Sequence, residues 1–167
     1  MRVILQKTDR CCLKANGEDF SEIRGGLLVL IGISQSDTEK EADLLAEKIL
    51  RMRIFTDEND KMNLSIMDRS VAGDILAVSN FTLYANCKSR RPDFMKAARP
   101  DEANKLYEYF LASLKRIAEA IGKEDPSLHI PEIKTGVFGA HMEISFTNLG
   151  PITIILDSDE LTSAKRS

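Results

Sequence analysis

Two hydroxyl side chains, Ser79 and Thr82, lie in the stretch SNFTL and are candidate nucleophiles for acyl transfer. A hydroxyl nucleophile needs a base within hydrogen-bonding reach and a third group that orients the base. His141 is the plausible base, because His129 lies in an irregular segment between two prolines. No glycine-flanked elbow surrounds the serine, and nothing in the sequence connects it to His141. The pattern therefore favours ordinary strand positions for both hydroxyls over a catalytic triad.

The segment GVFGAH (136–141) does not match a nucleotide-binding fingerprint. Its glycines are separated by two residues, unlike those of the G-x-G-x-x-G motif, and the sequence contains no Walker-type loop. The pattern favours a surface or pocket-wall position for His141. Phe138 and Met142 would then belong to the core or to the rim of a pocket.

The sequence predicts that the protein uses no metal and no other cofactor. It contains two histidines, and its three cysteines show no zinc-ligand spacing. Cys11 and Cys12 are adjacent and Cys87 is isolated, so no disulfide framework is indicated. Free thiols, the lack of a long apolar run and the lack of a basic, apolar leader together predict a cytoplasmic protein.

Positive charge is concentrated in residues 88–99 of a chain that is acidic overall. The net charge of −3 over 167 residues is not typical of a nucleic-acid-binding protein. The short basic stretch contains Lys88, Arg90, Arg91, Lys96 and Arg99. Charge alone favours a solvated loop for this cluster, and a phosphate-binding patch is the alternative.

Gly150 and Pro151 stand at the entrance to the apolar stretch PITIILD, where neither residue suits a strand. Proline lacks the N–H that a sheet ladder requires, and glycine weakens strands. The pattern favours a hairpin turn, NLGP, between the strands AHMEISFTN and PITIILD. The alternative is a cis Gly-Pro peptide whose fixed carbonyl oxygens point outward and distinguish mirror-image substrates.

Periodicity predicts the strands that must position these residues. We expect strands at 2–7 and 11–15 that pair with each other, a central strand at 23–34, and a strand at 73–85 that contains SNFTL. The closing hairpin around NLGP completes the sheet.

Two amphipathic helices are predicted between the strands. The first follows Thr38, which has capping-box spacing with Glu41, and the second runs from Pro100 to a stop at Gly122. The fold is therefore expected to be α+β: a mostly antiparallel or mixed, barrel-like sheet with two main helices packed on it. A single domain is expected over 1–157, followed by a polar tail over 158–167.

Several stretches, in collinear order, resemble the D-aminoacyl-tRNA deacylase family, whose members carry Ser-Gln-Phe-Thr-Leu and Asn-x-Gly-Pro-x-Thr motifs. The matching stretches are RVILQK, GGLLVLIGIS, RIFTDENDKMNLS, SNFTL, RRPDF, LYEYF, GVFGAHM and TNLGPIT. The similarity extends to ILD near residue 157 and covers nearly the whole chain. It implies the D-Tyr-tRNA deacylase fold and a homodimer with active sites at the subunit interface.

The resemblance also implies a tRNA-binding ester hydrolase of translation quality control. Members hydrolyse the ester between a D-amino acid, or glycine, and the 3′-terminal adenosine of tRNA, and they spare L-aminoacyl-tRNA. Gly150 and Pro151 would form the chiral filter, inserted from one protomer into its partner's pocket. Backbone N–H groups around Phe81 and Thr82 would hold the oxyanion, and the 2′-hydroxyl of the substrate would assist proton transfer.

The candidate site residues follow from the same resemblance. The catalytic stretch would be Ser79, Asn80, Phe81 and Thr82. The substrate-binding residues would be Lys7, Phe138, Met142, Asn148, Gly150, Pro151 and Thr153, of which Phe138 and Met142 would line the adenosine pocket. Lys88, Arg90 and Arg91 are our own candidates for contacts to tRNA phosphates, which require only charge and reach.

Three positions depart from the family pattern. Asn80 stands in place of glutamine, Lys7 replaces an arginine and loses its planar fork, and His141 stands where an acidic residue is more common. Two alternatives therefore stay open. One is a deacylase with relaxed chirality that clears glycyl- or alanyl-tRNA errors, and the other is a non-catalytic dimeric RNA-binding module.

Overall fold

A long antiparallel hairpin of β1 (Arg2–Ala15) and β2 (Glu18–Gly32) forms the base of the sheet in the computed structural model, which describes residues 1–163. Asn16 and Gly17 connect the strands with φ angles of 52° and 86°, as an Asn-Gly hairpin turn requires. The strands predicted at 2–7 and 11–15 are therefore not paired with each other, because both are parts of β1.

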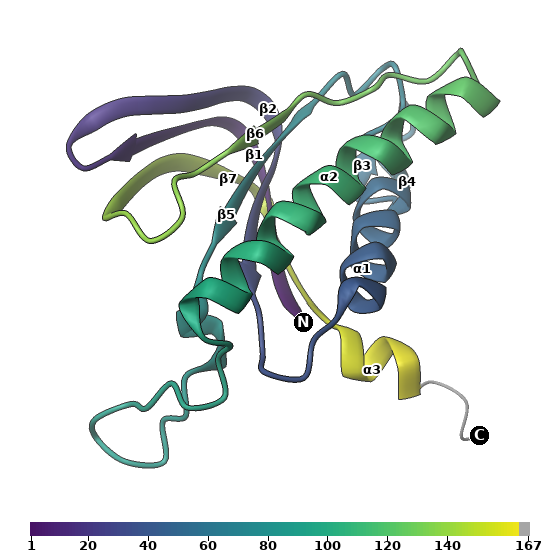
Figure 1. Cartoon of the computed structure of the whole chain (residues 1–167). Helices are drawn as coiled ribbons and strands as arrows, with labels where there is room; N and C mark the ends of the chain where they lie inside the picture. Colours follow the sequence, from purple (N-terminus) through teal and green to yellow (C-terminus); the bar gives the residue numbers. More distant parts are fainter. Residues whose placement is uncertain (164–167) are drawn as a thin grey trace.

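Five strands form an open, mixed sheet in the order β6-β5-β2-β1-β7 (Figure 1). β5 (Asp74–Ser79) lies parallel to β2 and to β6 (Ile133–Thr135), whereas β7 (Met142–Asp157) is antiparallel to β1. The central strand predicted over 23–34 is confirmed as the second half of β2. The α+β class is confirmed as well, but the sheet is open at β6 and β7 and does not close into a barrel.

Two helices cover one face of the sheet (Figure 1). α1 (Glu39–Arg51) begins with the predicted capping box, in which the Glu41 carboxylate accepts the Thr38 N–H at 2.9 Å. α2 (Pro100–Glu124) starts at the predicted proline and runs two residues beyond the predicted stop at Gly122. Apolar side chains of both helices and of the facing sheet form the main core.

Three short strands lie outside the predicted strands. β6 follows the irregular, proline-flanked segment that contains His129, and β3 (Phe55–Thr56) pairs with β4 (Met62–Leu64) around a turn. The predicted polar tail begins with the short helix α3 (Ser158–Ser163). The remainder of that tail, 164–167, lies outside the described residues.

Two predicted strand boundaries are wrong. The strand predicted over 73–85 ends at Ser79, and the residues that follow form a 3₁₀ helix, η1 (Phe81–Tyr84). The predicted closing hairpin is a single strand, β7, both halves of which pair with β1. Both differences arise from contacts of Asn80 and of residues 149–152.

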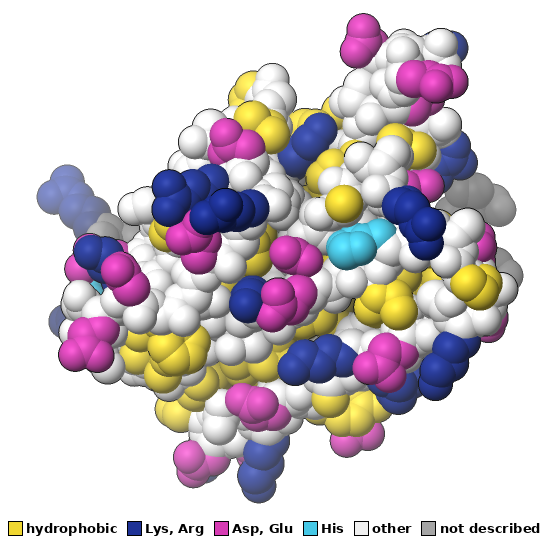
Figure 2. Space-filling view, turned by 90° about the horizontal axis from the view of Figure 1, so that it is seen from above, with side chains coloured by type: hydrophobic (Ala, Val, Ile, Leu, Met, Phe, Trp, Pro, Cys, Tyr) yellow, Lys and Arg dark blue, Asp and Glu magenta, His cyan; other side chains and the backbone are white. Residues whose placement is uncertain are grey.

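Within residues 1–163, no helix combines the length and apolar character needed to cross a membrane. On the face seen in Figure 2, basic and acidic side chains lie close to one another, with hydrophobic side chains in patches between them. This face therefore carries mixed charge rather than a field of one sign.

Candidate functional site

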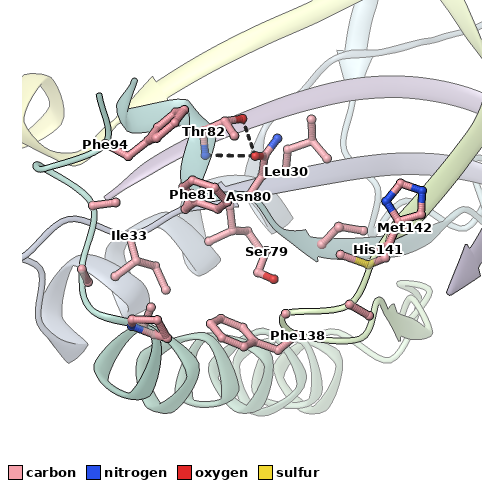
Figure 3. A pocket seen from close by; sticks show the side chains of 18 of the residues that line it. Leu30, Ile33, Ser79, Asn80, Phe81, Thr82, Phe94, Phe138, His141 and Met142 are labelled. Atoms are coloured by element: carbon pink, nitrogen blue, oxygen red, sulfur yellow. Dashed lines mark hydrogen bonds between the residues drawn. The ribbon is translucent and has the colours of Figure 1, made fainter. Parts of the chain in front are cut away.

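A cavity of about 720 Å³ opens where β5 ends, between η1, the start of α2 and the segment 138–144 (Figure 3). Its lining brings together six predicted site residues: Ser79, Asn80, Phe81, Thr82, Phe138 and Met142. Of the described residues that line it, His141 alone is ionisable. The cavity is therefore apolar and nearly uncharged, an environment in which backbone dipoles act strongly.

Strand β2 fixes the position of η1 through two features. The Asn80 N–H donates to the Ile31 carbonyl at 2.7 Å, which sets the point where the chain leaves β5. A Cβ atom at Gly32 would lie 2.8 Å from Leu83 Cβ and 3.3 Å from the Asn80 carbonyl oxygen. Gly32 therefore allows the close approach of η1 to the sheet, and any larger residue would displace it.

The Asn80 side chain caps η1 and occupies one of its backbone donors. Its Oδ1 accepts from the Thr82 N–H at 3.1 Å and from the Thr82 hydroxyl at 2.6 Å (Figure 3). The predicted strand stops here because this side chain gives the backbone a local partner in place of the sheet ladder. Within residues 1–163 the Phe81 N–H forms no hydrogen bond, so it is the unpaired donor of this turn.

The side chains of the cavity do not form a triad. No hydrogen bond among the described residues joins the His141 ring to Ser79 or Thr82, and Figure 3 shows His141 beside Met142, away from Thr82. The Thr82 hydroxyl donates instead to Asn80. Thr82 was predicted as a strand residue but lies in η1, while Ser79 is the last residue of β5.

Tyr107 of α2 supports the wall of the cavity and was not predicted. Its buried hydroxyl donates to the Ala77 carbonyl at 2.9 Å, and its ring centroid lies 5.9 Å from that of Phe138. Burial raises the pKa of this hydroxyl, which keeps it a neutral donor. The available signal was a tyrosine next to Leu106 on the apolar stripe of a helix, because a buried tyrosine needs an acceptor.

Gly150 and Pro151 lie in a wide bulge of β7 and not in the hairpin turn that the pattern favoured. Between two paired positions, β1 contributes Lys7 alone, whereas β7 contributes residues 149–152. Gly150 has a φ angle of 114°, the Gly150–Pro151 peptide bond is cis, and both residues are exposed. The strand continues past the proline because the bulge takes it out of the ladder.

The base of this bulge is closed by side chains. Asn148 donates through Nδ2 to Thr153 Oγ1 at 2.9 Å and accepts the Ile152 N–H through Oδ1 at 3.1 Å. Lys7 points elsewhere, with its Nζ 5.1 Å from the centroid of the Phe55 ring. The bulge and Lys7 are thus separate from the cavity of their own chain, whose lining contains none of these residues.

Lys88, Arg90 and Arg91 are exposed in the loop between η1 and α2, which projects from the domain (Figure 1). None of the three forms an ion pair with another described residue. Among residues 1–163, no three His, Cys, Asp or Glu side chains are grouped so that they could hold a metal ion.

We predict that Asn80→Ala exposes the Thr82 amide. Loss of a capping side chain costs about 1 kcal/mol, so hydrogen exchange at this amide should accelerate by about fivefold to tenfold in an NMR experiment. Asn86→Ala is the matched control, because the Asn86 Oδ1 accepts from the Lys88 N–H at 3.2 Å and makes no bond to η1. Equal exchange rates at Thr82 in the wild type and in Asn80→Ala would contradict the capping role.

The chain is similar to known proteins over nearly its whole length. A sequence model of the family described as D-Tyr-tRNA(Tyr) deacylase matches residues 4–157. The D-aminoacyl-tRNA deacylase of Dictyoglomus turgidum is 44% identical over 167 residues, which cover 99% of this chain and 98% of the relative. The enzyme of the same name from Thermus aquaticus is 46% identical over 161 residues, which cover 96% and 97%.

Solved structures share the fold. A structure titled c-Myc DNA unwinding element binding protein has a TM-score of 0.79 at 38% identity and covers 94% of this chain and 98% of that one. A probable eukaryotic D-amino acid tRNA deacylase has a TM-score of 0.75 at 21% identity, with 93% and 97% covered. On the sequence match and these relatives, the chain belongs to the D-Tyr-tRNA(Tyr) deacylase family.

Proposed function

We propose that this protein hydrolyses the ester between a D-amino acid, or glycine, and the 3′-terminal adenosine of tRNA, and that it spares L-aminoacyl-tRNA. The observation that carries the proposal is an apolar, nearly uncharged cavity, in a chain of this family, that is lined by Phe81, whose N–H has no hydrogen-bond partner among residues 1–163. Such a cavity can stabilise an oxyanion without a charged side chain.

The reaction is the addition of water to the acyl carbon and the departure of the ribose oxygen. The carbonyl oxygen becomes an oxyanion, and the Phe81 N–H donates to it. The Thr82 N–H can join only when Asn80 Oδ1 releases it, since that oxygen now accepts the amide at 3.1 Å. The attacking water gives up one proton and the departing ribose oxygen takes one up. The neighbouring 2′-hydroxyl of the substrate relays this proton, because the His141 ring forms no hydrogen bond with Ser79 or Thr82 among the described residues.

The terminal adenosine would bind beside Phe138 and Met142 at the end of the cavity opposite η1. Both side chains are half-buried, and Met142 is held by a close approach to Gly136, where a Cβ atom would lie 2.7 Å from its sulfur. An aromatic ring and a polarisable thioether suit the flat, apolar face of a purine.

The chiral filter would be the bulge at Gly150 and Pro151, supplied by the partner protomer of a homodimer. Support comes from β7, an edge strand whose Phe146, Leu149 and Ile155 side chains are 37%, 36% and 64% exposed. An exposed apolar edge strand is typical of a surface that another chain covers. Asn148 and Thr153 would act indirectly, by holding the base of the bulge.

A deacylase with relaxed chirality is the second candidate, and one observation favours it. Lys7 extends toward Phe55 rather than toward the bulge, so the side chains that hold the base of the bulge are those of Asn148 and Thr153, with a longer contact from Gln6 at 3.4 Å. A non-catalytic RNA-binding module is less well supported, because the cavity and its backbone donor are intact.

The first test is hydrolysis of D-Tyr-tRNA, L-Tyr-tRNA and glycyl-tRNA by the purified protein in the presence of EDTA. We expect rapid loss of the D-tyrosyl and glycyl esters and no loss of the L-tyrosyl ester. Hydrolysis of both tyrosyl esters would favour relaxed chirality, and no hydrolysis of any ester would exclude the deacylase.

The backbone donor can be removed separately from its side chain. Phe81→Pro deletes the N–H, and proline suits this position because Phe81 is the first residue of η1 and Asn80 is extended, with φ −146° and ψ 94°. We expect kcat for D-Tyr-tRNA to fall by about 10²–10³-fold in Phe81→Pro, relative to Phe81→Ala as the matched control. Thr82→Ala should stay within about tenfold of the wild type, because it keeps the backbone donors.

Two outcomes would contradict this assignment. Equal rates for Phe81→Pro and Phe81→Ala would show that the N–H is not a donor to the oxyanion. An inactive Thr82→Ala with native circular dichroism would indicate a side-chain nucleophile instead.

Gly150→Ala should reduce the D-over-L preference while the fold persists. At a φ angle of 114° the new Cβ atom would lie 2.6 Å from the Ile152 side chain and 2.9 Å from its backbone nitrogen, so the bulge must change shape. Gly17→Ala is the control, because Gly17 also has positive φ but its Cβ atom would meet nothing within 4 Å. We expect the ratio of rates for D- and L-Tyr-tRNA to fall by about tenfold or more in Gly150→Ala alone.

A further inference from the structure

A second, polar cavity of about 850 Å³ is lined by Tyr84, the last residue of η1, and by the residues that follow it. The two cavities adjoin each other along two segments, although no residue lines both. In η1, Phe81 and Thr82 line the first cavity and Tyr84 lines the second. In the loop that precedes α2, Ala97 lines the first cavity and Lys96 lines the second.

Charged side chains in the second cavity differ in whether they are paired. Arg2 is bound to the Asp157 carboxylate at 2.8 Å and to the Leu83 carbonyl at 2.8 Å, so these groups fix the floor of the cavity and largely cancel each other's charge. Lys88 and Lys96 line the same cavity and form no ion pair with any described residue. Their ammonium groups are available to an anion.

Neutral donors lie beside these lysines. The hydroxyls of Ser34 and Ser36 are 3.1 Å apart in the lining, and together with the ammonium groups they can donate to an anionic oxygen. Burial raises the pKa of the Tyr84 hydroxyl to about 12, so this wall does not acquire negative charge near neutral pH. Asp159 also lines the cavity, and its carboxylate offsets part of the positive charge of Lys88 and Lys96.

We propose that the second cavity binds the phosphodiester backbone of the nucleotides that precede the terminal adenosine of the substrate RNA. The inference rests on the proposed function, because it places the terminal nucleoside in the first cavity. A nucleoside bound there must carry its 5′ phosphate out of an uncharged pocket, and phosphates bind where lysines and hydroxyls can contact them. The loop that supplies both lysines holds five basic residues and one acidic residue between positions 85 and 99, although the chain has a net charge of −3.

The loop concentrates positive charge, unlike the face of the molecule seen in Figure 2. On the face in Figure 2, basic and acidic side chains are interspersed, so that face does not provide a continuous track for RNA. Arg90 and Arg91 lie in the same loop but outside the lining of the cavity. They would contact phosphates farther from the ester. Lys88 and Lys96 would contact the phosphates nearest to the ester.

The test compares two double variants of equal charge change. Lys88→Ala with Lys96→Ala removes the unpaired cations of the cavity. Lys115→Ala with Lys123→Ala, on the exposed surface of α2, is the control. The probes are a 5′-labelled single-stranded RNA ending in CCA with a free 3′-hydroxyl, and adenosine alone.

We expect the Kd for the RNA to rise on the order of tenfold in the Lys88 and Lys96 variant and to change little in the control. The slope of log Kd against log salt should become shallower by about one to two in the same variant, because two phosphate contacts are lost. Adenosine affinity should be unchanged. With D-Tyr-tRNA as substrate, KM should rise and kcat should stay constant.

Three results would overturn the proposal: no RNA binding by the wild-type protein, equal Kd and salt slope in both double variants, or an equal loss of adenosine affinity. Because the probes carry no ester, binding is measured apart from hydrolysis. A wild-type protein that binds RNA through Lys88 and Lys96 but hydrolyses no ester would refute the proposed function and leave this inference standing.

Discussion

The hydrogen bond from the Asn80 N–H to the Ile31 carbonyl is the interaction on which the rest of the site depends. It ends β5 beside β2, and η1 begins there with the Phe81 N–H, which has no hydrogen-bond partner in the part of the chain that the structure describes. Gly32 makes this arrangement possible, because any side chain there would collide with Leu83. The donor is thus placed by main-chain geometry and by the absence of a side chain. Such a donor needs no reorganisation when charge develops in front of it, which is the property that an oxyanion site requires.

The parts of the fold that were predicted correctly are those in which local chemistry and burial agree. The capping box at Thr38 is one example, because its hydrogen bonds close within one turn, and the buried run of β2 is another, because its continuous apolar sequence suits a central strand. Predictions failed where the backbone could adopt two conformations and a side chain or a distant strand stabilised one of them. FTLY looks like strand sequence by its apolar content, but Asn80 Oδ1 competes for the Thr82 N–H and bends it into η1. Asn-Leu-Gly-Pro suits a hairpin turn equally well, and only the pairing of both halves of β7 with β1 makes it a bulge.

The candidate site was predictable to a similar extent. Ser79, Phe138 and Met142 were expected near each other, and one cavity holds all three. Tyr107 and Gly32 were missed because they act through contacts that the sequence does not display: a hydroxyl reaching the Ala77 carbonyl across the core, and the empty space needed by a neighbouring turn. Gly150 and Pro151 were predicted as site residues, yet the bulge that contains them does not line the cavity of its own chain. A second protomer would explain this separation, since an exposed edge strand can carry a group into a partner's pocket but not into its own.

The proposed arrangement places phosphate binding and ester hydrolysis in separate cavities, and there is a physical reason for that division. A lysine beside the acyl carbon would attract the carboxylate product as strongly as the oxyanion, and it would therefore slow product release. Phosphate attraction needs no such proximity, because it acts over a distance of about 10 Å at ordinary salt concentrations. Lys88 and Lys96 can consequently raise the local concentration of RNA from the adjoining cavity, while the first cavity keeps the low polarity in which a backbone N–H is an effective donor. In this arrangement salt should weaken substrate capture but leave the hydrolytic step nearly unaffected, so the two functions of the site can vary independently.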